Sequence, residues 1–155
     1  MSGGIEPGTR LPDWDVPAVD AGRMKTTAAL LRDPTPIHWD PAVLRELGMG
    51  ERPINQGPLN MAYVMNMLAA FAGGHGRVRR LRVRFRGTVR AGDHLRAGGV
   101  VTAVRTGQAD GSGADRLCDC DVTLSVLDGD AAGETVLTGT ATVALPGEGT
   151  TDERP

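Results

Sequence analysis

The segment from Pro58 to Ala72 constrains the fold most, because it combines helical periodicity with an apolar surface on almost every side. Apolar residues recur there at spacings of three and four, and other apolar residues fill the positions between them. Pro58 suits the first position of a helix, and Gly73-Gly74 suits its end. A helix of this kind is buried in a protein or a membrane, and this one is too short to span a bilayer. The rest of the chain must therefore wrap it.

The second half of the chain supplies the wrapping. From Val78 the pattern changes to period two, with apolar residues on one face of a strand and arginines on the other. Turns rich in glycine and aspartate then separate three more predicted strands, at about 94–105, 116–127 and 135–145. This spacing is typical of an antiparallel meander. We therefore expect an α+β fold in which a long central helix is wrapped by a curved antiparallel sheet.

Composition indicates one ordinary domain. The chain has 155 residues, 40% hydrophobic and 23% charged, with a net charge of −2. We expect the domain at residues 11–145, between flexible ends at 1–10 and 146–155. The overall charge gives no reason to expect a nucleic-acid partner, and no apolar window is long enough for a membrane span.

The cysteines and the cationic residues give further expectations. Cys118 and Cys120 are too close in sequence for an ordinary disulfide, so we expect reduced thiols and a cytoplasmic location. We expect these two thiols to face opposite sides of a strand, which argues against a shared metal. Of the 17 cationic residues only Lys25 is a lysine. The arginine-rich strand face at 80–90 is expected to be solvated or to meet a subunit, with phosphate binding as the alternative.

One loop combines titratable side chains with stiff geometry. Asp33 and His38 lie five residues apart in the loop, and Pro34 and Pro36 restrict the backbone between them. A carboxylate and an imidazole that are held rigidly can share a water molecule and exchange protons near neutral pH. The spacing is not specific by itself, since Asp-Pro commonly opens turns and a single His near a helix start is commonly a surface or capping residue.

A second segment, Asn55-Gln56-Gly57-Pro58, opens the apolar helix. The free backbone N–H groups at a helix start, together with the helix dipole, suit an anionic oxygen. A base, an acid and an oxyanion donor are together what the addition of water to an enoyl thioester requires. From the pattern alone, Gln56 and Asn60 are either polar pocket groups or helix-start caps, and Gly57 is alternatively a loop residue with an unusual φ.

Three motifs in order resemble the MaoC-like, (R)-specific enoyl-CoA hydratases. Residues 33–41 resemble the family's Asp-x-Asn-Pro-[Ile/Leu]-His signature and the Asp-Pro helix start that follows it. Residues 52–57 resemble the stretch that ends in His-Gly before the central helix, and residues 83–93 resemble the Arg-Phe…Pro-Val…Gly-Asp segment. The likeness covers about residues 24–145. Thr35 stands where the family usually has Asn, Arg32 where it often has Gly, and Gln56 where it often has His.

This resemblance implies a single hot-dog domain, usually paired into a dimer. It implies that Asp33 and His38 activate the water and that the Gly57 N–H holds the thioester oxygen. The remaining residues expected at the site are Gln56, Asn55 and Thr35. The implied reaction is a hydro-lyase reaction, the reversible hydration of trans-2-enoyl thioesters to 3-hydroxyacyl thioesters. Coenzyme A or acyl carrier protein would be part of the substrate, and no metal or other cofactor is implied.

Two alternatives stay open. Some relatives work as heteromers in which one subunit carries the chemistry, so the chain is alternatively an accessory, non-catalytic hot-dog subunit. Its partner would be a second copy or a second hot-dog subunit, and its length of one hot-dog unit indicates a site completed by that subunit. The other alternative is a hot-dog acyl thioesterase. Those enzymes usually place a carboxylate on the central helix, whereas residues 58–72 contain no Asp or Glu.

Overall fold

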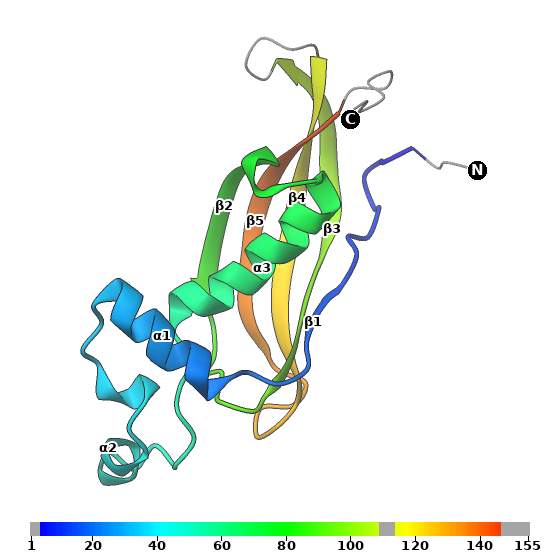
Figure 1. The fold of residues 1–155 in the computed structure, drawn as a ribbon. Coiled ribbons are helices and arrows are strands. Elements are labelled where there is room, and N and C mark those ends of the chain that lie inside the picture. The colour runs from blue at the N-terminus through cyan, green and yellow to red at the C-terminus, as the bar shows by residue number, and fades with distance from the viewer. Residues whose placement is uncertain (1–3, 109–113, 147–155) are drawn as a thin grey trace.

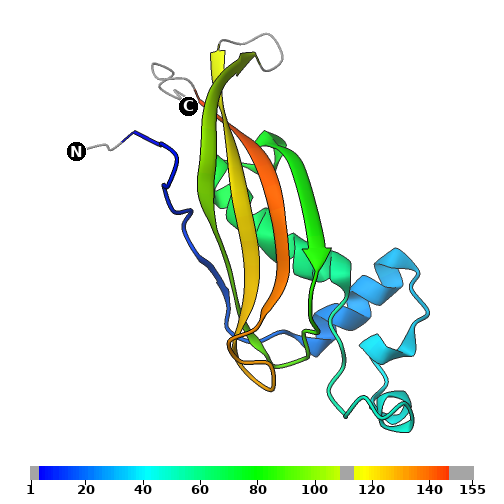
Figure 2. The same cartoon turned by 180° about the vertical axis from the view of Figure 1, so that it is seen from behind.

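The chain folds as one long helix against one curved sheet. In a computed structural model that describes residues 4–108 and 114–146, five antiparallel strands pair in the order β1-β3-β4-β5-β2. The helix α3 (Gly57–Ala72) crosses one face of this sheet (Figure 1). Figure 2 shows the sheet from behind, with the helix on its far side. The strands are β1 (Trp14–Val16), β2 (Val78–Phe85), β3 (His94–Gln108), β4 (Ala114–Asp128) and β5 (Thr135–Leu145). The expected α+β class and the wrapped central helix are confirmed.

The helix α3 and the concave side of the sheet form the core. Pro58 stands in the first turn of α3, and Gly73 ends the helix with φ 84°, which glycine adopts without steric cost. Val64 and Leu68 are fully buried, and they belong to the same cluster as Leu124 and Leu137 of the sheet. Burial of this apolar surface is the main driving force for folding, since each fully buried side chain of this size contributes about 1.5–3 kcal/mol.

The structure adds pairing that the sequence pattern did not indicate. The N-terminal segment was expected to be flexible up to residue 10, yet the Gly8 N–H donates to the Val101 carbonyl at 2.8 Å, and the Val101 N–H donates to the Thr9 carbonyl at 2.8 Å. The short strand β1 pairs with β3 through Trp14 and Ala97. Of the expected tail at 146–155, only Pro146 lies within the described residues.

A helical arm, residues 20–47, lies beside one end of the sheet (Figure 1). It contains α1 (Ala21–Leu31), the short 3-10 helix η1 (Pro36–His38) and α2 (Pro41–Glu46). Asp20 and Asp40 cap α1 and α2 by accepting hydrogen bonds from Gly22 and Ala42. Between the core helix and β2 stands a further 3-10 helix, η2 (His75–Arg77).

The expected orientation of the two cysteines is wrong. Cys118 and Cys120 are both buried in the core, at 0% and 1% exposure, while Asp119 between them pairs with Arg105 on the outer face. Alternate residues of a strand share a face, so two thiols separated by one residue point to the same side. Burial raises the pKa of both thiols, that of Cys120 to about 12.

None of the helices at residues 4–108 and 114–146 has the length and apolar character that a membrane span requires.

Candidate active site

The end of α1 places Asp33 at the edge of the arm. Arg32, the residue after the helix, adopts the left-handed conformation with φ 51° and ψ 41°, and its N–H donates to the last turn. The Asp33 N–H then returns to the Ala28 carbonyl at 2.9 Å. This closure reverses the chain, and Pro34 keeps it extended after the turn. As a consequence, Asp33 directly follows the residue that ends the helix.

His38 faces Asp33 across this turn. The His38 Nε2 lies 3.6 Å from the Asp33 Oδ2, with the two side chains 12% and 27% exposed. The other ring nitrogen, Nδ1, lies 2.6 Å from the Ile54 carbonyl oxygen, so it carries a proton and donates it there. In the neutral ring the lone pair is therefore on Nε2, on the side of Asp33. A separation of 3.6 Å is too long for a direct hydrogen bond, and a water molecule can bond to both groups.

Thr35 favours the charged form of the Asp33 carboxylate. The Thr35 N–H donates to the Asp33 Oδ1 at 3.0 Å. Hydrogen bonds from the side chain and the backbone of Thr35, in that order, lower the pKa of Asp33, and the nearby His38 adds a smaller effect in the same direction. Because Oδ1 is engaged by Thr35, Oδ2 remains for a partner on the His38 side. Threonine at this position thus provides a donor to the carboxylate.

The second predicted segment is joined to the first through Ile54. Besides accepting from His38, Ile54 donates its N–H to the Ile37 carbonyl at 3.0 Å. Asn55, the next residue, donates its N–H to the Val89 carbonyl at 2.8 Å and so is tied to the segment after β2. The loop before α3 is therefore fixed on one side to His38 and on the other side to the segment that follows β2.

Asn55 and Gln56 are buried rather than exposed loop residues, at 4% and 1% exposure. The Asn55 Nδ2 donates to the Asn60 Oδ1 at 2.7 Å, and the Gln56 Nε2 donates to the Met24 carbonyl of α1 at 2.8 Å. The Gln56 Oε1 is buried and has no hydrogen-bond partner within the described residues. An unpaired buried carbonyl oxygen is costly, and bound water or substrate can satisfy it.

Gly57 is the first residue of α3, not a loop residue with an unusual φ. Its N–H belongs to the first turn, where backbone donors have no partner within the helix. A β-carbon at Gly57 would lie 3.1 Å from the Phe85 Cζ at the end of β2. The absence of a side chain thus lets Phe85 lie directly over the helix start.

An ion-pair cluster, Arg52 with Asp93 and Asp130, holds the loop before α3. The Arg52 Nη1 donates to Asp93 at 2.7 Å and to the Ala91 carbonyl at 2.8 Å, and Nη2 donates to Asp130 at 2.7 Å. Asp93 is 1% exposed and also accepts from the Arg90 N–H. These contacts raise the pKa of Arg52 and lower that of Asp130. Ala91 and Asp93, at the end of the 83–93 motif, therefore hold the loop before α3 in position.

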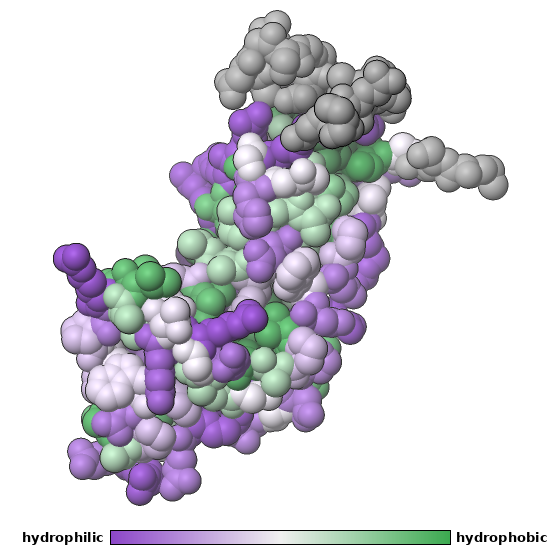
Figure 3. All heavy atoms as spheres, viewed as in Figure 1, coloured by the Kyte–Doolittle hydropathy of each residue, from purple (hydrophilic) through white to green (hydrophobic). Residues whose placement is uncertain are grey.

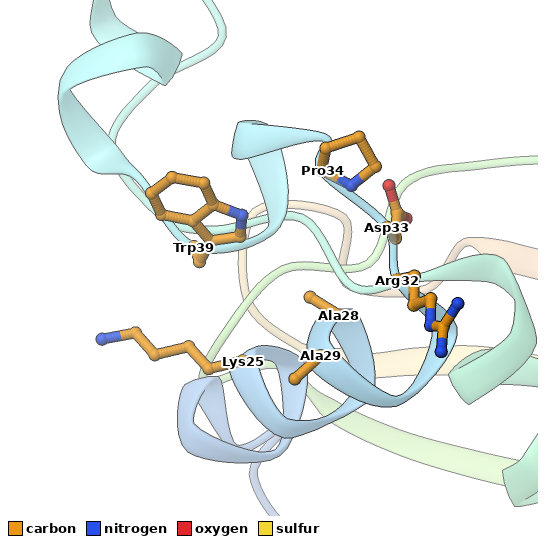
Figure 4. Close-up of a pocket in the computed structure, with 7 residues that line it drawn as sticks. All are labelled: Lys25, Ala28, Ala29, Arg32, Asp33, Pro34 and Trp39. Carbon is orange, nitrogen blue, oxygen red and sulfur yellow. The ribbon is translucent and has the colours of Figure 1, made fainter.

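A groove of about 510 Å³, which no sequence pattern indicates, runs along α1 to Asp33 (Figure 4). Ala28, Ala29 and Pro34 line its apolar part, and the half-exposed indole of Trp39 faces α1 across it. Lys25 and Arg32 complete the lining. The spacing of Lys25, Ala28, Ala29 and Arg32 marks one helix face, but only the packing of Trp39 turns that face into a groove.

A family model for the MaoC like domain matches residues 20–117, which include the arm, the site loop and the core helix. The chain belongs to the MaoC-like domain family. Among curated protein sequences none matches this chain.

Solved structures with the same fold include two (R)-hydratases. An (R)-hydratase from A. caviae involved in PHA biosynthesis is 26% identical over 94% of this chain and 100% of its own, with a TM-score of 0.74. The R-hydratase PhaJ1 from Pseudomonas aeruginosa is 20% identical over 97% of this chain and 90% of its own, with a TM-score of 0.70. The ChsH1-ChsH2 complex from Mycobacterium tuberculosis contains a chain 20% identical over 94% of this one and 100% of its own, with a TM-score of 0.68. The MaoC-like domain is thus a hot-dog domain.

Proposed function

We propose that this chain hydrates trans-2-enoyl thioesters reversibly to 3-hydroxyacyl thioesters. The observation that carries the proposal is the pair of Asp33 Oδ2 and His38 Nε2, 3.6 Å apart, each with its other polar atom already engaged. Such a pair offers two acceptors to one water molecule. Membership of the MaoC-like family and the likeness to an (R)-hydratase support the same reaction.

In the proposed reaction, the water bound by Asp33 and His38 attacks the β-carbon of the enoyl group. The pair takes one proton from this water as the carbon–oxygen bond forms, and the electrons of the double bond move to the thioester oxygen. The α-carbon then receives a proton from the pair, so one water is added across the double bond and both side chains regain their starting state. The lowered pKa of Asp33 supports its role, since the carboxylate is available as a base.

The thioester oxygen becomes negative in the enolate, and we assign the Gly57 N–H to it. This N–H starts a helix of 16 residues, whose dipole favours a negative charge at that end. The buried Asn55 and Gln56 side chains, which directly precede this donor in sequence, would exclude bulk water and orient the substrate. The acyl group would arrive on coenzyme A or acyl carrier protein. The proposal needs no metal and no other cofactor, and the free thiols of Cys118 and Cys120 support a cytoplasmic location.

The test is the rate at which the purified chain removes the conjugated double bond of a crotonyl or longer enoyl thioester. Asp33→Asn and His38→Ala should each lower the rate by about 10²-fold to 10⁴-fold, because each removes one ligand of the water. Asp20→Asn is the matched control, since Asp20 caps the same helix outside the site and Asn caps equally well. Wild-type rates in both site variants, with intact folding, would reject the proposal. Release of free thiol without hydration would indicate a thioesterase.

A second candidate is an accessory hot-dog subunit that completes the site of a partner. Exposed apolar surface on the arm and the likeness to a complex of two proteins favour it. Large apolar side chains of the arm are exposed near the site, Leu30 at 79%, Leu31 at 51% and Trp39 at 40%. Figure 3 shows hydrophobic surface over the outer end of α1. The likeness to the ChsH1-ChsH2 complex points the same way. Activity that appears only when a second hot-dog chain from a neighbouring gene is added would favour this candidate, and full activity of the chain as a homodimer would reject it.

A further inference from the structure

The groove beside Asp33 has an amphipathic design. Lys25, Ala28, Ala29 and Arg32 lie at helical spacings of three and four, so they share one face of α1. Alanines form the floor, Trp39 faces them, and cations stand at both ends (Figure 4). Lys25 and Arg32 are seven residues apart, or about 10 Å along the helix axis. Asp33 closes the groove at the Arg32 end, so Lys25 marks the end away from the candidate catalytic carboxylate.

The charge of Lys25 is available to a ligand. The Lys25 side chain is exposed, and no carboxylate lies within ion-pair distance of it among the described residues. Arg23, two residues earlier on the same helix, differs because it lies 3.9 Å from Asp20 and does not line the groove. An unpaired ammonium next to an apolar floor is suited to a ligand with a long neutral chain and a terminal anion.

We propose that Lys25 binds the 4′-phosphate end of the phosphopantetheine arm of coenzyme A, with the arm lying in the groove and its thioester at Asp33. The inference rests on the proposed hydration of enoyl thioesters. It adds that this substrate is held as a coenzyme A ester and that a specific side chain holds the carrier. The arm has the required polarity, because a phosphate at one end and a thioester at the other are joined by a neutral chain.

Coenzyme A fits these observations better than a carrier protein does. Docking of a carrier protein uses an extended charged surface, whereas the groove offers two separate cations, Lys25 and Arg32. The arginines of β2 are exposed on another element, at Arg80, Arg82 and Arg84, and they do not line the groove. A small phosphate ester needs no more than the contacts that the groove provides.

The single lysine of the chain permits a direct binding test that does not depend on turnover. Reductive methylation with ¹³C-formaldehyde gives one lysine resonance, and the Lys25→Gln variant identifies it against the α-amino group. Coenzyme A and 4′-phosphopantetheine should shift this resonance at constant ionic strength. Pantetheine, which lacks the phosphate, and inorganic phosphate at the same concentration should not. Equal responses to pantetheine and phosphopantetheine, or no response to either coenzyme A or phosphopantetheine, would overturn the proposal.

Kinetics give the second test. Lys25→Gln should raise KM for an enoyl-CoA about fivefold to tenfold with little change in kcat, as expected for the loss of one charged contact. KM for the matching enoyl-pantetheine should not change. Arg23→Gln, the matched control, should leave both values unchanged. An unchanged KM for the enoyl-CoA would overturn the proposal. A lower KM for the enoyl group on acyl carrier protein than for the enoyl-CoA would also overturn it. If no variant or substrate shows hydration while phosphopantetheine still shifts the lysine resonance, the hydration proposal has failed and the phosphate site stands.

Discussion

The core of the domain and its helical arm differ in how far they cover their apolar side chains. The core helix α3 buries apolar side chains on several sides within its own chain, and Val64 and Leu68 are completely covered. The arm leaves Leu30 79% exposed and forms a groove under Trp39. The candidate water site lies where the two regions meet, because His38 of the arm bonds to Ile54 of the loop before α3. A stable core thus carries a segment whose uncovered surface is available to a ligand or a partner.

The two helix ends show the same contrast. Both α1 and α3 end at a residue in the left-handed conformation, Arg32 with φ 51° and Gly73 with φ 84°. Glycine adopts this conformation at no steric cost, whereas a residue with a β-carbon loses about 1 kcal/mol or more. The core helix has the residue that favours stability. The arm has a cation that lines the groove, at a position where the family often has glycine.

Removal of Arg52 should disturb the loop before α3, which connects the two regions, most severely. Arg52→Ala leaves Asp93, 1% exposed, without its cationic partner, and releases the loop before α3. We expect a loss of roughly 3 kcal/mol in the free energy of unfolding, because an unpaired buried carboxylate is poorly solvated. Urea unfolding measures this loss. Arg45→Ala, which removes an exposed pair with Glu51, should cost less than about 1 kcal/mol, and equal losses in the two variants would contradict the account.

Leucine truncation should separate the two regions. Leu68→Ala, in the core, should lower the free energy of unfolding by about 2–5 kcal/mol, since it leaves a cavity between α3 and the sheet. Leu30→Ala, in the arm, should change it by less than about 0.5 kcal/mol, because this side chain is mostly in water already. Chemical denaturation of both variants checks the pair. A loss at Leu30 as large as that at Leu68 would mean that the exposed arm is covered by another subunit in solution.

Substitution of the residue that ends each helix should change the stability of the protein with opposite sign. Arg32→Gly removes the backbone strain and should raise stability by about 0.5–1 kcal/mol, or a few degrees in Tm. Gly73→Ala introduces the same strain at the end of α3 and should lower stability by about 1 kcal/mol. Differential scanning calorimetry measures both. A loss of stability in Arg32→Gly would show that the arginine side chain stabilises the arm more than its backbone strain destabilises it.

The smallest expected effect concerns pH. Thr35 lowers the pKa of Asp33, so the carboxylate keeps its charge, and its capacity as a base, to a lower pH than an ordinary aspartate. Activity is lost as the pH falls through this pKa. Thr35→Val removes the side-chain donor, so the acidic limb of the kcat/KM profile should move to higher pH, while the rate well above that limb changes little. An acidic limb at the same pH in the variant would show that Asp33 is not the titrating base.

Sequence periodicity predicted the elements that bury most of their side chains. The core helix at 58–72 and the strand at 135–145 agree with α3 and β5 because their apolar positions repeat within the element. The strand β1 was not predicted because three residues are too few for an alternating pattern, and its structure depends on pairing with β3. Apolar spacing alone does not locate the start of helix α1, because the Asp20 cap sets it.

The candidate site was predictable to the extent that it is local. Asp33, Thr35 and His38 lie in one short loop, and the structure brings them into contact. The contact of His38 with Ile54 depends on tertiary packing, so no spacing rule contains it. The same holds for the Gln56 bond to the Met24 carbonyl and for the groove beneath Trp39. The roles of Asp33, His38, Gly57, Gln56, Asn55 and Thr35 in catalysis stay predictions.

A double-mutant cycle on Asp33 and His38 tests the central claim most directly, with kcat/KM for enoyl-thioester hydration as the measurement. If both side chains bind one water, either single change removes its activation. The double variant Asp33→Asn with His38→Ala should then be no slower than about the slower single variant. Losses that multiply in the double variant would mean that the two residues act independently, and the shared water would have to be abandoned.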